Sequence, residues 1–452
     1  MDLHGRRIHF MGAGGIGVSA LAELTWRAGA RVTACDLHAN DRTAHLRRLG
    51  IPVSEGHDPR HLDEVDLLVY TSAVPPDHPE RSAAPGRCEA MRRGTFLARF
   101  LRGRRVAGVS GAHGKTTTTW LLGQLLVHCG MDPTVILGGV PVGEASNVRQ
   151  GESDLAVVEL DESDESFLEP DLTVAVVTAV EPDHLDHYAT AEAVEQAYRR
   201  FAQGVAPHGV LVCAVDDPGA WALWRAHAGS KLATGLGPEA ELRGAERTAE
   251  GMSQTFTALD RQEPVGRFAL HLPGTHNAKN ALTALGAARA LGAPWDALRE
   301  ALPRCVGVAR RFELIGARSG VTVVEDYAHH PTEVRAALAT ARTVHPGRVV
   351  ALFQPHLYSR TLLLGEALGA ALATADAVVV AHVYPAREAP IPGANAGLVV
   401  DAVRQRNGSV AGPVPRDHAA AAVLERVRPG DLVLVLGAGD IGDCARELLE
   451  RL

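Results

Sequence analysis

A glycine-rich segment, SGAHGKTTTT at residues 110–119, has the residue types of a phosphate-binding loop. Gly111 and Gly114 would let backbone N–H groups approach phosphate oxygens, and the helix expected to follow would direct its positive end at the same anion. Lys115 would bind the β- and γ-phosphates, with its side chain facing the ligand and not the core, and the Thr116 hydroxyl would reach Mg²⁺. The strict P-loop pattern has one further glycine, so the segment is a variant. A plain strand–helix turn with a solvated lysine is the alternative.

Acidic residues follow two further apolar runs. The run LAVVELDESDE places Glu159 directly after an expected strand, where a carboxylate commonly holds the Mg²⁺ that bridges phosphates. The run LTVAVVTAVEPDHLDHY ends in the grouping E-x-D-H-x-D, in which His184 could bind a second cation through a neutral imidazole. A solvated acidic loop and a structural histidine are the alternatives. The pattern favours metal binding by Thr116 and Glu159 at one site and by His184 at a second.

The N-terminal segment MGAGGIGVSA is a second loop suited to phosphate, and a strand ending in Asp36 follows about 20 residues later. This arrangement resembles the dinucleotide-binding fingerprint. A nucleotide-diphosphate sugar would fit the same geometry as well as a dinucleotide does. The residues expected to bind it are Gly12, Gly14, Gly15, Gly17, Ser19 and Asp36.

Two polar groupings follow expected strands in the last third of the chain, VEDYAHHPTEV and FQPHLYSRT. The carboxyl ends of parallel strands meet at one rim of a sheet, where α/β proteins form ligand sites. Two arginines that precede this region could reach phosphates across a cleft. Together these residues suggest a domain that closes on a site in the middle of the chain; they are Asp326, Tyr327, His329, His330, His356, Ser359, Arg360, Arg310 and Arg311.

The elements expected to position these residues alternate between short apolar strands and helices, which is typical of βαβ units around parallel sheets. At roughly 150 residues per domain, a chain of 452 residues suggests about three domains. The stretch 231–270 is more polar and alternating, as in hairpins or an edge sheet. We therefore predict an α/β protein with three domains, spanning residues 1–102, 103–303 and 304–452.

Composition narrows the class of protein. Lys+Arg 45 against Asp+Glu 53 gives a net charge of −8 without a charged block, which argues against a partner nucleic acid. No apolar run approaches the ~18 residues that cross a bilayer, and the N-terminus lacks a signal-peptide core, so we expect no membrane insertion and a cytoplasmic location. The six cysteines are scattered and none forms a C-x-x-C pair, so their spacing suggests neither a zinc site nor a disulfide framework.

Taken together, the motifs resemble those of the Mur ligases, in order and over essentially the whole chain. The broadly shared motifs include GAGGIGVSALA, SGAHGKTTTT, VELDESDESF, VEPDHLDHY, LPGTHNAKNA, GVARRFE and LVLVLGAGDI. Three others are narrower and are similar to those of the muramate–alanine branch of the family: DYAHHPTEV, FQPHLYSRT and YPAREAPIPG.

The resemblance implies ATP-dependent amide synthesis in peptidoglycan precursor assembly, with UDP-N-acetylmuramate and L-alanine as substrates. The lactyl carboxylate would take the γ-phosphate of ATP, and the amine of L-alanine would attack the resulting acyl phosphate. Mg²⁺ or Mn²⁺ would be the cofactor besides ATP. The implied fold is a Rossmann-like N-terminal domain that binds the UDP-sugar, a central P-loop ATPase-type domain, and a Rossmann-like C-terminal domain that closes on ATP and binds the amino acid.

The same resemblance implies a role for individual residues. Lys115, His184, His329 and Arg360 would act in catalysis. The residues implied to bind ATP are Gly111, Ala112, His113, Gly114, Lys115, Thr116, Thr117, His276, Asn277, Asn280, Arg311 and Asp326. The residues implied to bind the UDP portion are Gly12, Ala13, Gly14, Gly15, Ile16, Gly17, Ser19, Asp36 and Ser72.

Three positions depart from the family pattern. Ala112 stands where threonine is common, Ala179 where asparagine is usual, and Leu357 where some members have arginine. Two other functions remain open. One is a ligase that recycles murein tripeptide onto UDP-muramate, which would share nearly every motif. The other is a catalytically silent nucleotide-binding module, which is favoured only if Ala112 and Ala179 have disabled the site. A dehydrogenase would leave the second loop and the acidic strand ends unexplained, and we reject it.

Overall fold

The computed structural model describes residues 2–183, 185–386 and 388–452. It divides into two compact units. The first comprises Met1–Glu246, Phe256–Phe268 and Lys279–Val306, and the second comprises Arg247–Thr255, Ala269–Ala278 and Gly307–Leu452. No helix in the described part of the chain is long and apolar enough to span a bilayer.

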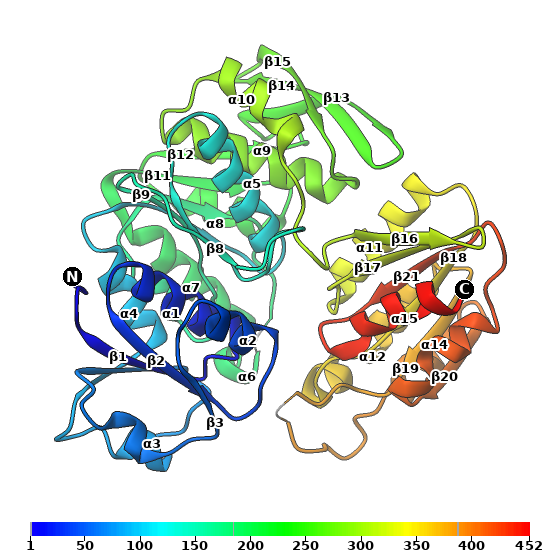
Figure 1. Ribbon diagram of the computed structural model, residues 1–452. Helices are drawn as coiled ribbons and strands as arrows, with labels where there is room; N and C mark the ends of the chain where they lie inside the picture. Colours follow the sequence, from blue (N-terminus) through cyan, green and yellow to red (C-terminus); the bar gives the residue numbers. More distant parts are fainter. Residues whose placement is uncertain (1, 184, 387) are drawn as a thin grey trace. The chain divides into compact units, whose positions relative to one another are not determined.

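The first unit begins with a five-stranded parallel sheet in the order β3-β2-β1-β4-β5. Helices α1, α2 and α4 lie on one face, and the short α3 lies on the opposite face (Figure 1). Apolar side chains of β1, β2 and β4 pack on the first face, and a smaller apolar cluster that includes Met11 and Leu68 packs on the other, so β1 and β4 are buried almost throughout. The bounds are β1 (Arg7–Met11), α1 (Ile16–Arg27), β2 (Arg31–Asp36), α2 (Asp41–Arg48), β3 (Val53–Glu55), the 3₁₀ helix η1 (Pro59–Leu62), β4 (Leu67–Tyr70), α3 (Pro79–Ser82), β5 (Glu89–Arg92) and α4 (Arg93–Leu101).

A ten-stranded sheet follows, in the order β15-β14-β13-β12-β11-β10-β6-β9-β7-β8. Its strand β6 lies between β9 and β10 and is parallel to both, so the carboxyl ends of these three strands share one edge. The strands are β6 (Arg105–Ser110), β7 (Thr134–Ile136), β8 (Val148–Arg149), β9 (Leu155–Glu159), β10 (Leu172–Val177), β11 (Val205–Ala214), β12 (Lys231–Gly235), β13 (Leu242–Glu250), β14 (Ser253–Asp260) and β15 (Glu263–Leu270). The helices are α5 (Lys115–His128), α6 (Leu185–Tyr188), α7 (Ala191–Gln203), α8 (Pro218–Ala226), α9 (Thr275–Ala290) and α10 (Trp295–Ala301).

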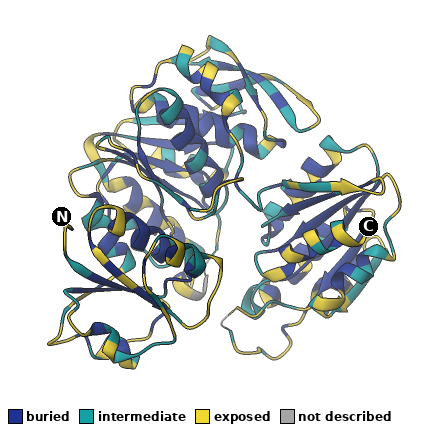
Figure 2. Cartoon of the chain, in the orientation of Figure 1, coloured by how far each residue is buried: buried dark blue, intermediate teal, exposed yellow. Residues whose placement is uncertain are grey.

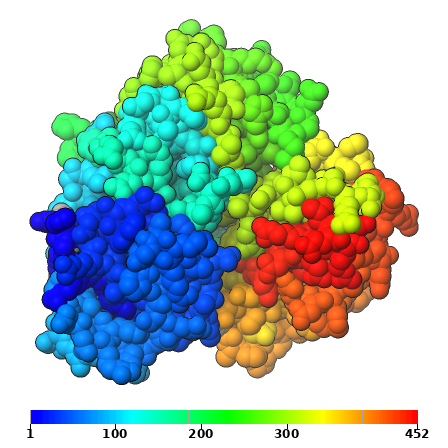
Figure 3. All heavy atoms as spheres, in the orientation of Figure 1, coloured from blue at the N-terminus to red at the C-terminus, as the bar shows by residue number. Residues whose placement is uncertain are grey.

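The first sheet and most of the second belong to the same unit, and polar contacts join their elements. Asn147 Nδ2 donates to Ile16 O over 3.1 Å, and Ser146 Oγ donates to Glu23 Oε2 over 2.7 Å. The space-filling view shows the blue N-terminal surface continuing into the cyan surface of the second sheet (Figure 3).

The second unit contains a six-stranded sheet in the order β16-β17-β21-β18-β19-β20, in which β16 runs antiparallel to β17 and the other pairs are parallel. Apolar clusters cover both of its faces, and its central strands are buried throughout (Figure 2). The strands are β16 (Glu313–Arg318), β17 (Val321–Asp326), β18 (Val349–Phe353), β19 (Ala377–Ala381), β20 (Val410–Val414) and β21 (Leu432–Leu436). The helices are α11 (Pro331–Val344), α12 (Tyr358–Leu372), α13 (Gly397–Arg404), α14 (Arg416–Leu424) and α15 (Asp443–Arg451).

Three α/β sheets in series confirm the predicted fold class. The strand–helix alternation follows the apolar runs, because buried parallel strands need apolar residues on both faces. The boundaries at residues 102 and 303 stay predictions. The antiparallel edge strand β16 and the short strands β3 and β8 carry too few apolar residues to be found from the pattern, and glycine and proline interrupt β20.

Candidate active site

The predicted phosphate loop joins the end of β6 to the start of α5. Gly111 has a φ of +138° and Gly114 a φ of +80°, a region that favours glycine. A β-carbon on Gly111 would lie 2.2 Å from Thr178 Oγ1, and one on Gly114 would lie 2.6 Å from Asn280 Oδ1. Both glycines are therefore required by backbone conformation and by space. The loop packs closely against β10 and α9.

Lys115 is the first residue of α5, and its ammonium group is held inside the loop. Nζ donates to Gly111 O over 2.7 Å and to Glu162 Oε1 over 2.8 Å. The lysine side chain is 16% exposed and that of Glu162 is 4% exposed. The acidic run after β9 folds back over this lysine and covers its ammonium group, and the expectation that the side chain faces a bound phosphate stays a prediction. Burial opposes the charge, but Glu162, Asp161 and Glu159 outweigh it and raise the pKa of Lys115, so the ammonium is charged at neutral pH.

Thr116 and Glu159 meet where α5 starts beside the end of β9. Thr116 Oγ1 donates to Glu159 Oε1 over 3.0 Å, and the second carboxylate oxygen accepts the Gly138 N–H over 2.6 Å. A hydroxyl and a carboxylate beside a phosphate loop are the oxygen donors that a hard divalent cation prefers. This pair therefore fits the predicted metal site. His184, the third predicted ligand, lies outside the described residues.

Residues after β10 complete the loop. Thr178 Oγ1 donates to Ser110 O over 3.3 Å and also to His113 O. The Ala112 N–H donates to Ala179 O over 3.0 Å, so two of the departures from the family pattern are direct backbone partners. Sequence reasoning missed Thr178, because a threonine inside an apolar run is typical of an ordinary strand.

The structure places the other residues predicted to bind ATP as follows. His113 Nε2 lies 3.4 Å from Glu181 Oε2, and Thr117 is buried in the first turn of α5. Asn280 lies against Gly114, as the contact above shows. His276 and Asn277 begin α9, and Asn277 Nδ2 donates to Pro273 O over 2.7 Å.

The first glycine loop joins β1 to α1, as predicted. Gly12 has a φ of +89°, and a β-carbon there would lie 2.7 Å from Thr71 Cγ2. Asp36 closes the loop, since its Oδ2 accepts the Gly14 N–H over 2.7 Å. Ser72 lies exposed in the loop after β4. The remaining predicted residues follow Gly12 in order: Ala13, Gly15, Ile16, Gly17 and Ser19, the last of which donates its hydroxyl to Ile16 O over 3.1 Å.

Two further residues reach this loop that the motif did not indicate. Arg42 Nε donates to Gly14 O over 2.5 Å, and Asn40 Nδ2 donates to the same oxygen over 3.2 Å. Asn40 is also the N-cap of α2, where its side chain accepts from Arg42 N and Thr43 N. The sequence did contain a signal for Asn40, because asparagine is common at the N-cap position directly before a helix.

In the second unit, Asp326 ends β17 and lies between two backbone donors. Its oxygens accept the Phe312 N–H over 2.7 Å and the Ala328 N–H over 2.8 Å. Burial raises the pKa of Asp326 to about 6, although nearby Arg311 opposes this effect. The Arg311 guanidinium lies 4.9 Å from the centre of the Tyr327 ring.

The adjacent Arg310 has a different environment. Its Nε donates to Glu325 Oε1 over 2.6 Å, and its NH2 donates to Gly437 O and Gly439 O over 2.9 and 3.0 Å. These contacts bind the segment before β16 to β17 and to the loop after β21. Of the two arginines, Arg310 therefore serves the packing of this unit.

A polar group gathers beyond the carboxyl ends of β17, β18 and β19. The His329 and His356 ring centres lie 5.9 Å apart, and His356 stacks on Tyr384 at 5.7 Å. Arg360 NH1 lies 3.3 Å from His356 Nδ1. Burial, together with His329 and Arg360, lowers the pKa of His356 to about 4, so this imidazole is neutral at neutral pH and can accept from Arg360.

Neighbouring residues hold this group in place. His330 is the N-cap of α11, and Glu333 Oε2 accepts the His329 and His330 N–H groups over 3.1 and 3.3 Å. Glu388 accepts the Ser359 N–H over 3.0 Å and also binds the Ser359 hydroxyl. Leu357, with a φ of +70°, is the N-cap of α12. Sequence reasoning did not assign Tyr384 or Glu388, although both lie in the VYPAREAPIPG motif.

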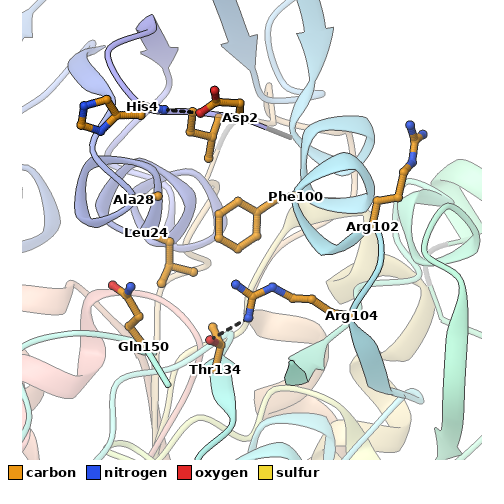
Figure 4. A pocket seen from close by; sticks show the side chains of 10 residues that line it. Asp2, His4, Leu24, Ala28, Phe100, Arg102, Arg104, Thr134 and Gln150 are labelled. Carbon is orange, nitrogen blue, oxygen red and sulfur yellow. Dashed lines mark hydrogen bonds between the residues drawn. The ribbon is translucent and has the colours of Figure 1, made fainter. Parts of the chain in front are cut away.

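A cavity of about 320 Å³ lies elsewhere in the first unit, between Leu24, Phe100, Arg104 and Thr134 (Figure 4). Arg104 NH1 donates to Thr134 Oγ1 over 3.3 Å at its wall. Among the described residues that line this cavity, none is a predicted site residue. The predicted residues instead gather at the carboxyl ends of parallel strands.

Known proteins and protein families are similar to this chain over nearly its whole length. Profiles described as "Mur ligase family, catalytic domain", "Mur ligase middle domain" and "Mur ligase, glutamate ligase domain" match residues 7–105, 109–288 and 310–439. The chain is 42% identical over 444 residues to a UDP-N-acetylmuramate–L-alanine ligase of Anaeromyxobacter sp. (strain Fw109-5), covering 98% of this chain and 97% of the relative. The chain belongs to the Mur ligase family.

Two solved structures of Mur ligases are similar to it. The crystal structure of UDP-N-acetylmuramate-alanine ligase from Thermotoga maritima is 29% identical, with a TM-score of 0.85 and 98% of each chain covered. A murein peptide ligase from Psychrobacter arcticus 273-4 is 22% identical, with a TM-score of 0.71, covering 99% of this chain and 98% of that one. At 22% identity, the similarity to the murein peptide ligase supports the fold alone. The resemblance to Mur ligases inferred from the motifs is thus confirmed.

Proposed function

We propose that this chain is an ATP-dependent ligase that joins L-alanine to the lactyl carboxylate of UDP-N-acetylmuramate in peptidoglycan precursor synthesis. The observation that carries the proposal is full-length similarity to alanine ligases together with a complete phosphate loop at Lys115, Thr116 and Glu159. A carboxylate oxygen would attack the γ-phosphorus of ATP and release ADP. The alanine amine would then attack the acyl carbon, and the tetrahedral intermediate would collapse with loss of phosphate.

The phosphate loop would bind ATP through its backbone. Residues 111–117 offer N–H groups at the start of α5, whose dipole favours an anion there. Lys115 would exchange its ion pair with Glu162 for the β- and γ-phosphates, because a charged ammonium at this place neutralises the charge that repels the incoming carboxylate. Asn280 beside Gly114, with His276 and Asn277 at the start of α9, would contact the adenine side, and His113 would complete the loop.

Thr116 and Glu159 would hold Mg²⁺ or Mn²⁺, with His184 as a ligand of a second cation. When bound, the cation would neutralise the negative charge of the transferred phosphoryl group. Glu159 is held ready by the Gly138 N–H, and Thr116 by its place in the first turn of α5.

The remaining residues would bind the two other substrates. Residues 1–102 would bind the UDP portion through the first glycine loop, Asp36 and Ser72. Residues 304–452 would supply Arg311 and Asp326 to ATP, and His329 and Arg360 to the amino acid. Arg360, whose NH1 lies 3.3 Å from the neutral His356, would bind a carboxylate such as that of L-alanine. We place the enzyme in the cytoplasm, where its substrates would be made.

Phosphate release from ATP with UDP-N-acetylmuramate tests the proposal, with L-alanine, murein tripeptide or no acceptor. We expect release that depends on L-alanine, and an amide product identified by its mass. Release with the tripeptide alone would reassign the chain to peptide recycling. No release with either acceptor would support a silent nucleotide-binding module, and would direct attention to Ala112 and Ala179.

A further inference from the structure

A compact group of potential metal-binding side chains lies in the N-terminal sheet, beside the first glycine loop, whose Gly12 and Ala13 N–H groups donate to Cys35 O. It consists of His9 on β1, Cys35 on β2, His61 on η1 and Glu80 on α3, and we call it the His–Cys–Glu cluster. The register of β1 and β2 pairs His9 with Thr33 and Met11 with Cys35, so these side chains share one face. This is the face that α3 covers, opposite α1 (Figure 1).

The donor atoms of the cluster converge. His9 Nε2 lies 3.1 Å from Glu80 Oε1 and 3.3 Å from Cys35 Sγ, while His61 Nδ1 lies 3.0 Å from Glu80 Oε1. Cys35 Sγ lies 3.5 Å from both carboxylate oxygens, and all four donors lie within 4.8 Å of one another. A tetrahedral zinc site with bonds of about 2.0–2.3 Å has ligand–ligand edges of roughly 3.3–3.8 Å. Small side-chain shifts would therefore admit the ion.

The charge of the cluster suits a divalent cation. Glu80 is fully buried, and its described side-chain contacts are His9, His57, His61 and Cys35, with no arginine or lysine. A divalent cation with a glutamate and a cysteine thiolate would leave the site neutral, with the thiol proton released to solvent.

The cluster also has the outer contacts that metal sites use. His9 Nδ1 lies 2.8 Å from Thr33 Oγ1, a contact that can hold the proton on Nδ1 and leave Nε2 as the ligand. His57 Nδ1 lies 3.0 Å from Glu80 Oε2 and 3.2 Å from Cys35 Sγ, where it would orient both. Around these groups lies a small apolar cluster that includes Met11, Leu62, Leu68 and Val74.

We propose that His9, Cys35, His61 and Glu80 bind a structural divalent cation of the Zn²⁺ class. The mixture of sulfur, imidazole and carboxylate donors is typical of zinc, and calcium or magnesium would prefer oxygen alone. The ion would link η1 and α3 to β1 and β2. On this face the apolar core is small and by itself provides little stabilisation of the fold. This site is separate from the phosphate loop and does not depend on the proposed ligase activity.

A cobalt titration of the full chain tests the proposal. The protein is purified without a histidine tag, treated with a chelator, and titrated with Co²⁺ while its absorption spectrum is recorded. We expect one tightly bound ion per chain that gives a thiolate-to-cobalt charge-transfer band and the strong visible bands of tetrahedral cobalt, both removed by Zn²⁺. A weak octahedral spectrum without the thiolate band would overturn the proposal, since that is the signature of oxygen ligands such as Glu159.

Two pairs of variants locate the ion. Cys35→Ser should abolish the charge-transfer band, and His61→Asn, which retains a polar atom near the Nδ1 position, should weaken binding at least about tenfold. Cys88→Ser, just before β5, and His38→Asn, just after β2, are the matched controls and should bind as the unchanged chain does. A charge-transfer band that survives Cys35→Ser would overturn the assignment.

Thermal unfolding provides a readout that does not require the variants to fold well. Zn²⁺ should raise the Tm of the chelator-treated, unchanged chain, because an ion bound to the folded state alone stabilises it by mass action. The chelator should lower the Tm of the purified protein. If Zn²⁺ leaves the Tm unchanged, the cluster is a hydrogen-bonded polar network in which three imidazoles donate to Glu80, and the proposal fails.

Discussion

Single residues of the phosphate loop are constrained by charge as much as by shape. Lys115 and Glu162 form a largely buried ion pair, so each carries a desolvation cost that the other offsets. The same proximity keeps the lysine charged and within reach of a phosphate. The Glu162 carboxylate thus holds the Lys115 ammonium at the place where the phosphates of ATP would replace it.

Lys115→Met should reduce kcat/KM by at least about a hundredfold, because it removes the cation that faces the transferred phosphate. It should also lower the free energy of unfolding by about 3 kcal/mol, since the buried Glu162 carboxylate would lose the cation that offsets its desolvation. Steady-state kinetics and urea unfolding measure the two effects. Adding Glu162→Gln should restore stability but not activity, and recovery of both would contradict the catalytic role. Lys231→Met is the control, since Lys231 donates to carbonyls at the end of α8.

Asp326 should make the stability of the second unit depend on pH. Its folded pKa of about 6 exceeds the ordinary aspartate value of about 4, so the folded state holds the proton more tightly. Its contribution to stability is complete below about pH 4 and is lost as the pH rises through about 6, an effect of about 3 kcal/mol. Unfolding of the wild type and of Asp326→Asn, without ATP, should show this difference, which becomes constant above about pH 7.

Asp376→Asn is a control of opposite sign for that experiment. Burial opposes its charge, but the Arg342 guanidinium, 2.7 Å away, outweighs it and lowers the pKa of Asp376. Its stabilising contribution is therefore present above the ordinary aspartate pKa and is lost as the pH falls. If both variants changed the pH dependence in the same direction, the burial argument for Asp326 would be wrong.

At the scale of elements, the junctions between strands and helices determine where the site forms. The loop between β6 and α5 is pressed against the end of β10, and the loop between β1 and α1 is closed by the end of β2. Side chains of adjacent parallel strands therefore meet at the same edge. Glycine is required in these loops because neighbouring strands leave no space for a β-carbon.

Gly111→Ala tests this requirement. The substitution combines a φ of +138° with a β-carbon 2.2 Å from Thr178 Oγ1 and 2.8 Å from Ala179 N, so the loop must move. Gly103→Ala, at a φ of +82° with open space around it, should cost only about 1 kcal/mol of backbone strain. We expect Gly111→Ala to unfold at distinctly lower urea and to lose measurable ATP binding by calorimetry. Equal effects of the two substitutions would show that crowding at β10 does not matter.

At the scale of the whole molecule, the residues proposed to bind the substrates and ATP are divided between two compact units. The first unit carries both glycine loops, and the second carries His329, Arg360 and Asp326. The residues proposed for the UDP portion lie in the first unit, and those proposed for the amino acid, His329 and Arg360, lie in the second. A substitution in one of these two groups should therefore affect the binding of its own ligand.

His329→Ala should therefore raise the KM for L-alanine by at least about tenfold and leave the Kd for UDP-N-acetylmuramate within about twofold. The reason is that His329 packs beside His356 and Tyr327 in the second unit, whereas the UDP loop belongs to the first. Kinetics with varied L-alanine and calorimetry with the UDP-sugar separate the two. His345→Ala, at a half-buried histidine of the same unit whose Nε2 lies 2.9 Å from Gly430 O, is the control. An equal loss of affinity for both ligands would place the amino-acid pocket elsewhere.

The amino-acid sequence by itself determined the fold class, the two glycine loops and the strand-end positions of Glu159, Asp326 and His329. Each of these depends on local patterns: apolar runs produce buried strands, and glycine followed by a helix start produces an anion site. Such patterns hold within a few residues of chain, so the sequence shows them directly.

Only the tertiary structure decided which distant residues meet. It paired Lys115 with Glu162 and Ala112 with Ala179, and it brought His9, Cys35, His61 and Glu80 together. These contacts depend on strand order and register and on the path of the loops between strands. A shift of one residue in the β1–β2 register would move Cys35 to the other face, which is why no spacing in the sequence could indicate the cluster.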